Sequence, residues 1–159
     1  MNRKIHKIII IAISLLIIII GINLFKKDIW DKNANLLKEK VLAIEETNKT
    51  VNLSDITPFE WDTAYSFSPY TPKELIYDTV GYKWDNIHVT VDESMNQIVF
   101  LKDKKVVCYI YGYPSNIGYG LSFDVSEYKN GVRVLKIEDN LNFQLTKNNG
   151  VVSLKQMKQ

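Results

Sequence analysis

Apolar residues fill almost every position from Ile8 to Phe25, where only Ser14 and Asn23 are strongly polar. A helix of these 18 residues rises about 27 Å, close to the roughly 30 Å of a bilayer hydrocarbon core. This pattern predicts a transmembrane signal anchor over residues 8–25, preceded by a basic cytoplasmic tail over residues 1–7. A cleaved signal peptide is the alternative, but the run exceeds the usual core of about 7 to 15 residues and lacks a small-x-small cleavage site.

Charges on either side of the anchor indicate its orientation. Arg3, Lys4 and Lys7 precede the apolar run, and basic residues in a short flanking segment favour the cytoplasmic side of the membrane. A long domain is translocated largely regardless of its own charge. Lys26 and Lys27, on the other side, oppose this orientation. We expect a single-pass cell-membrane protein whose N-terminus is cytoplasmic, whose domain is extracytoplasmic, and whose residues 8–25 have the lipid bilayer as their partner.

The next segment, residues 26–55, combines a helical pattern with a polar stretch. Ala34, Leu37, Val41 and Ile44 recur at intervals of three and four, which places them on one face of a juxtamembrane amphipathic helix. That face is expected to pack on the chain's own domain, with pairing to a second copy or contact with lipid as alternatives. Trp30 lies where an interfacial aromatic belt would fall. Residues 47–55 are polar and predict a linker before an extracytoplasmic domain over residues 56–159.

The first part of that domain predicts a strand and a short helix. Residues 61–67 alternate, which predicts a strand with Phe59, Trp61, Thr63, Tyr65 and Phe67 on one side. Thr71 and Glu74 then fit a capping box, Pro72 fits the first helical position, and Gly81 fits a helix stop. A helix over residues 72–80 is therefore expected.

The second part of the domain reads as successive β-strands. Residues 88–92, 97–102 and 105–113 are rich in strand formers, and Asp103-Lys104 marks a tight turn between the last two. Asn130-Gly131 and Asn149-Gly150 are strong hairpin signals. The C-terminal half should form an antiparallel meander, which makes the fold α+β, with one short helix on a single twisted antiparallel sheet.

Charge and cysteine content exclude two classes of function. Beyond residue 25 the chain has 17 basic and 18 acidic residues, so the pI of 8.5 reflects the N-terminal tail. A nucleic-acid partner would need a basic patch within the domain and is not expected. The one cysteine, Cys108, cannot form an internal disulfide, and with two histidines it gives no pattern for a metal site. No cofactor is expected.

Two carboxylates are the only candidates for catalysis. Glu60 and Asp62 lie two apart on the predicted strand, with backbones about 7 Å apart on one face. That separation overlaps the range that glycoside hydrolases use, which raises the alternative of a cell-wall-directed hydrolase. The simpler explanation is the solvated face of a half-buried strand.

Tyrosines supply the candidate contact surface. Tyr109, Tyr111 and Tyr113 alternate along one strand with smaller residues, and a glycine- and tyrosine-rich loop follows them. Tyrosine is enriched at recognition sites, so the row, together with Trp61 and Tyr70, is a candidate surface for a peptide, a protein or a sugar ring. The alternative is that these rings pack in the core beneath the helix.

The run Trp61-Asp62-Thr63-Ala64-Tyr65-Ser66-Phe67-Ser68-Pro69-Tyr70-Thr71 resembles the Trp-Asp-x-x-Tyr-x-Phe-x-Pro-Tyr-Thr motif of small bacterial exported proteins. The similarity covers roughly residues 56–113. It implies a membrane- or lipid-anchored envelope protein and carries over no catalytic residues. This chain lacks a lipidation cysteine, so the helix would be its only anchor.

These patterns favour a non-catalytic binding or interaction module of the bacterial envelope, with an envelope protein or a glycan as partner. A cell-wall hydrolase using Glu60 or Asp62 and an immunity or inhibitor module are the alternatives.

Overall fold

The computed structural model describes residue 13, residues 28–123 and residues 130–158. The predicted anchor over residues 8–25 falls outside this part of the chain, apart from Ile13. None of the helices within the described residues is long and apolar enough to cross a bilayer.

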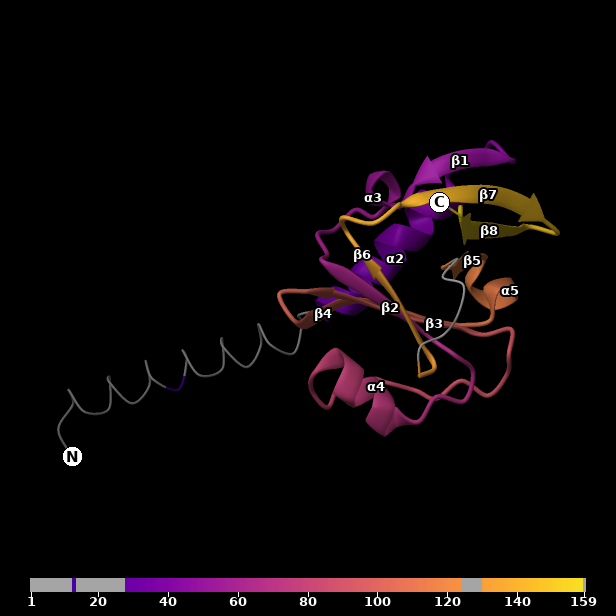
Figure 1. Cartoon of the computed structure of the whole chain (residues 1–159). Coiled ribbons are helices and arrows are strands. Elements are labelled where there is room, and N and C mark those ends of the chain that lie inside the picture. The colour runs from indigo at the N-terminus through magenta and orange to yellow at the C-terminus, as the bar shows by residue number, and fades with distance from the viewer. Residues whose placement is uncertain (1–12, 14–27, 124–129, 159) are drawn as a thin grey trace, which may run out of the picture.

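The described residues form an α+β fold with four helices and eight strands among them (Figure 1). The helices are α2 (Ile29–Leu42), α3 (Leu53–Ile56), α4 (Lys73–Val80) and α5 (Pro114–Ile117). The strands are β1 (Lys49–Asn52), β2 (Thr63–Phe67), β3 (Asn96–Lys102), β4 (Lys105–Gly112), β5 (Tyr119–Ser122), β6 (Val132–Lys136), β7 (Asn142–Asn148) and β8 (Val151–Gln156).

The strands form two four-stranded sheets rather than the expected single sheet. One sheet has the order β1-β7-β8-β5 and the other has the order β4-β3-β2-β6. The predicted C-terminal meander is wrong, because β5 pairs in parallel with β8 and β6 pairs with β2 in the other sheet. The hairpins at Asp103-Lys104 and Asn149-Gly150 follow their local signals, and Asn149 and Gly150 have φ of 47° and 79°. These angles fit the type I′ turn that Asn-Gly favours.

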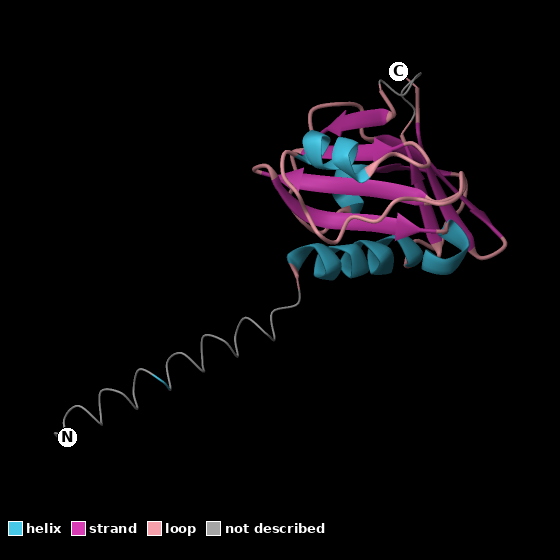
Figure 2. Cartoon of the chain, turned by 90° about the horizontal axis from the view of Figure 1, so that it is seen from below, coloured by secondary structure: helices cyan, strands magenta, loops and turns pink. Residues whose placement is uncertain are grey.

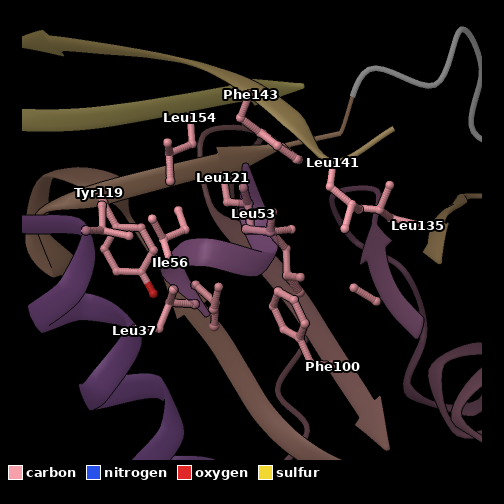
Figure 3. Packing of buried hydrophobic residues seen from close by; sticks show 14 of the residues in the cluster. Leu37, Leu53, Ile56, Phe100, Tyr119, Leu121, Leu135, Leu141, Phe143 and Leu154 are labelled. Carbon is pink, nitrogen blue, oxygen red and sulfur yellow. The ribbon is translucent and has the colours of Figure 1, made fainter. Parts of the chain in front are cut away.

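The main hydrophobic core lies between the two sheets (Figure 3). Phe100 comes from β3, Phe143 from β7 and Leu154 from β8, and each side chain is almost completely buried. Burial of apolar surface at about 25 cal/mol per Å² is the main force that holds the sheets together. Trp61 and Leu53 also belong to this core, so the chain between β1 and β2 closes one end of it.

A second, smaller core lies on the other face of the β4-β3-β2-β6 sheet, beneath α4. Ile76 and Val80 of α4 pack there against Val99 of β3. The predicted helix is confirmed as α4, which ends at Gly81 with φ of 94°. The predicted capping box is wrong, because the hydroxyl of Thr71 donates to the carbonyl of Ser68 instead of capping the helix.

A β-bulge in β4 changes which residues face each core. Phe100 pairs with Cys108, whereas Leu101 pairs with Val106, so Val107 is the extra residue. Val106 consequently packs in the second core and Cys108 in the main core. The predicted single face of Val107, Tyr109, Tyr111 and Tyr113 is broken at this point, since Val107 packs against the main core and Tyr109 in the second.

Helix α2 packs along β4, which is the edge strand of its sheet. Figure 2 shows α2, the first helix after the grey trace, lying along one side of the strands. Leu37 and Val41 lie in the main core, and Ala34 and Ile44 pack against it, which confirms the predicted stripe and its packing on the chain's own domain. The Asn33 side chain is buried, and its Nδ2 donates to the carbonyl oxygen of Val107 at 2.9 Å. The helix therefore gives a partner to a backbone carbonyl at the bulge of this edge strand.

The segment expected to be a linker, residues 47–55, has regular structure. Its first part is β1, which pairs antiparallel with β7, and its second part includes the start of α3. The polar composition predicted a linker because β1 is an edge strand, and only Val51 of its four residues is buried. Residues 29–55 therefore pack with the strands that follow, and the packed region begins at α2 rather than at residue 56.

Replacing Asn33 tests the contact between α2 and the bulge. We expect Asn33→Ala to lower the free energy of unfolding by about 1 to 3 kcal/mol, because the half-buried Val107 carbonyl loses its donor. Chemical denaturation of the full-length protein in detergent measures this. The matched control is Asn35→Ala, at an exposed position of the same helix. The Asn35 Nδ2 donates only to the exposed Asp31 carbonyl within α2. Equal effects of the two substitutions would contradict the role given to Asn33.

Candidate functional site

The five predicted binding residues do not form one surface. Trp61 is 3% exposed and its Nε1 donates to the Thr57 hydroxyl inside the main core, whereas Tyr70 is 58% exposed. Tyr113 lies beyond β4, where it precedes α5. Only Tyr109 and Tyr111 line a common hollow. The predicted surface thus reduces to these two residues.

Both of these tyrosines support the segment that was expected to form a strand over residues 88–92. The His88 amide donates to the Tyr109 hydroxyl, and the Tyr111 hydroxyl donates to the Val89 carbonyl at 3.0 Å. Gln97 Nε2 donates to the His88 carbonyl and to the Tyr109 hydroxyl. The segment has no strand pairing, because side chains rather than a neighbouring backbone satisfy its polar groups.

Burial fixes the chemical state of Tyr109. The ring is 6% exposed, and burial raises the pKa of its hydroxyl to about 12, against smaller opposing effects of the hydrogen bonds to His88 and Gln97. The hydroxyl therefore stays protonated at neutral pH and serves as a hydrogen-bonding group. Its role is to position the loop that forms one wall of the hollow.

Two adjoining hollows lie between α2 and the second half of β4, and we call them together the α2–β4 groove. Their volumes are about 160 Å³ and 290 Å³, and both are lined by Ala34, Tyr109 and Tyr111. The smaller hollow is also lined by Asn35, Lys38, Ile110, Ile117 and Tyr119. The larger one is also lined by Trp30, Asp31, Asn86 and His88. Ala34 lies where the two hollows meet, so its small side chain leaves room for the groove.

Aromatic rings make up much of the groove. The Tyr109 and Tyr111 rings stack with centroids 5.8 Å apart, and the His88 ring lies 5.4 Å from Tyr111 at a tilt. Trp30 contacts Trp84 edge to face at 5.2 Å. This packing fixes the rings before any ligand arrives, which lowers the entropy cost of binding.

Polar groups of both signs surround the rings. Asp31 and Lys38 form no ion pair with any described residue, and Asn35 uses only its Nδ2 within α2. The Trp30 Nε1 is buried and has no hydrogen-bond acceptor among the described residues. A buried donor without an acceptor costs free energy, and this nitrogen is too enclosed to face the hollow that the Trp30 ring lines.

The smaller hollow has a buried tyrosine at its inner end. Tyr119 is 2% exposed, and Figure 3 shows its hydroxyl directed toward α2. Burial raises the pKa of Tyr119, with a smaller contribution from the neighbouring Cys108. Burial likewise raises the pKa of Cys108, so this thiol is a core residue rather than a nucleophile.

The candidate catalytic pair lies elsewhere, next to the β3–β4 turn. Asp62 precedes β2 rather than lying on it, and its carboxylate accepts from Lys102 Nζ at 2.8 Å and from the Asp103 amide at 2.7 Å. These two hydrogen bonds lower the pKa of Asp62, with a smaller coulombic effect of Lys102. Glu60 is exposed and lines none of the hollows described above. Asp62 therefore anchors a turn.

Trp30, Ala34, Asn86 and His88 were not predicted as site residues. Trp30 was expected at the lipid interface, but its ring packs against the second core. Ala34 carried a usable signal, because it is the smallest member of the apolar stripe on α2. Asn86 and His88 reach the groove only through the fold of the loop after α4, which no local pattern shows.

Comparisons of this chain with protein-family models, with curated proteins and with solved structures find no match.

Substitution of Tyr109 distinguishes its supporting role from that of Tyr113. Tyr109→Ser removes a buried ring and the hydroxyl that holds the His88 segment, so we expect a loss of about 3 to 5 kcal/mol of stability. Tyr113→Ser is the control, because that ring is half-buried outside the strand. Thermal unfolding followed by near-UV circular dichroism measures both. A near-neutral Tyr109→Ser would show that the ring belongs to a surface rather than to the core.

Asp62 predicts a specific acid dependence of stability. Its pKa is below the ordinary value in the folded state, so its contribution is present above the unfolded pKa of about 3.9 and is lost as the pH falls through the folded pKa. Asp62→Asn should therefore lose less stability than the wild type on acidification below about pH 4. Urea unfolding at a series of pH values measures this, with Glu60→Gln as control. An unchanged acid dependence in Asp62→Asn would refute the assignment.

Proposed function

We propose that the protein is a non-catalytic binding module of the bacterial envelope, anchored by residues 8–25 with its domain on the extracytoplasmic side. The α2–β4 groove is its contact site. The single observation that carries the binding role is this groove, in which pre-positioned rings lie together with charged groups that form no ion pair with any described residue. Concave sites with aromatic walls and a few convergent polar groups are the usual form of ligand sites.

The position of the groove relative to the proposed anchor restricts the partner. Helix α2 begins four residues after Phe25, and Ala34 follows Ile29 by five residues. At 1.5 Å per residue, Ala34 is about 8 Å along the helix from Ile29. With the anchor in the bilayer, the groove lies close to the extracytoplasmic surface of that membrane. The partner is then a component of the membrane-proximal envelope.

The contacts of Asp62 do not fit the general-acid role in a glycoside hydrolase. A glycoside hydrolase needs one carboxyl that stays protonated to donate to the leaving group, which requires a raised pKa. The Lys102 and Asp103 contacts lower the pKa of Asp62 instead.

The envelope location is also supported by the motif at residues 61–71, which resembles that of small bacterial exported proteins.

Filling the groove tests this proposal. Ala34→Met places a longer apolar side chain between the two hollows and leaves every polar group intact. Full-length protein in detergent is incubated with cell-envelope fragments of the producing bacterium, and the bound fraction is measured after sedimentation. We expect Ala34→Met to reduce apparent affinity by roughly tenfold or more, because it occludes the center of the contact. The matched control is Ala43→Met, on an exposed position at the end of the same helix.

Equal binding by the wild type and Ala34→Met would remove the groove from the function. Protease added to intact protoplasts tests the location separately, and the proposal requires that it degrade the domain. A bound component that is a single stoichiometric protein would favor the immunity or inhibitor alternative.

A further inference from the structure

We propose that the α2–β4 groove binds sugar rings of an envelope glycan, by stacking and by hydrogen bonds to ring hydroxyls. This inference rests on the proposed function and names the chemical class of its partner. It is carried by the form of the groove and by the composition of its walls.

The dimensions of the groove fit a narrow polar chain. The larger hollow has a volume of about 290 Å³ and the smaller one about 160 Å³. Each is small beside the groove that an amphipathic helix or a protein loop occupies, whereas one sugar ring is of comparable size. Because the two hollows meet at Ala34, they provide two consecutive positions for linked sugar units.

The walls match the two kinds of surface on a sugar. A pyranose ring has an apolar C–H face that packs on an aromatic ring, and its edge carries hydroxyls that both donate and accept. Tyr111 and His88 provide the aromatic surface in the larger hollow, at a ring separation of 5.4 Å. Asp31 and Asn86 also line the larger hollow, and Asn35 and Lys38 line the smaller one. Carboxylates accept, ammonium groups donate and amides do both, so both hollows match a ring of hydroxyls.

Other ligand classes fit less well. A phosphorylated ligand would need several cationic groups, whereas Lys38 is the only lysine or arginine among the lining residues and Asp31 opposes it. A purely apolar ligand would leave the polar wall groups without water or partner. A proline-rich peptide also packs on aromatic grooves, and it is therefore the competing outcome of the experiment.

The experiment uses the full-length protein in detergent micelles and isothermal titration calorimetry. The probes are the tetrasaccharides of N-acetylglucosamine, glucose and mannose at millimolar concentration, and a proline-rich decapeptide. We expect at least one tetrasaccharide to bind, and to bind more tightly than its monosaccharide, since two hollows are filled. Ala34→Met should abolish binding and Ala43→Met should leave it unchanged.

Stability of each variant is checked by thermal unfolding, so that a loss of binding is not a loss of folding. If no tetrasaccharide binds while envelope fragments still bind in a manner that Ala34→Met prevents, the sugar assignment is wrong and the proposed function stands. Binding of the decapeptide in the groove would also overturn the sugar assignment. If neither sugars nor envelope fragments bind, both proposals fail.

Discussion

The contact between α2 and the edge strand β4 is the interaction on which the rest of this structure depends. An edge strand presents backbone groups without ladder partners, and proteins must cover them or accept association with other chains. Here the helix covers the edge, and Asn33 donates to the carbonyl of the bulged Val107. The same helix supplies Leu37 and Val41 to the main core and Trp30 to the second. It thereby ties together both cores and forms one wall of the groove.

The bulge in β4 explains why the tyrosines have different roles. A regular strand would place Val107 and Tyr109 on one face, but the extra residue separates them into different cores. Tyr109 then lies beneath Trp30 and Trp84, where its hydroxyl holds the His88 segment. Tyr111, two residues further along β4, remains accessible in the groove. A single inserted residue thus divides the row into a structural member and a contact member.

Local signals predicted the elements better than their arrangement. The apolar stripe of α2, the helix α4 with Gly81 and the turn at Asp103-Lys104 all depend on neighbouring residues, and all are present. The second sheet depends on pairings between segments far apart in sequence, such as β1 with β7 and β5 with β8, which no local pattern encodes. The candidate site was found only through Tyr109 and Tyr111. The other residues that line the groove come together through tertiary packing. The bulge determines the face of β4 on which each tyrosine lies, and the composition of the strand does not indicate it.

Hydrogen exchange of the native full-length protein tests the central contact most directly. A 14-residue helix such as α2 is marginally stable in isolation, so only packing on β4 can protect its amides strongly. The account predicts that the amides within α2 exchange as slowly as those of β4 and open together with them as one unit. Amides of α2 that exchange rapidly while β4 remains protected would show that the helix is not what covers this edge.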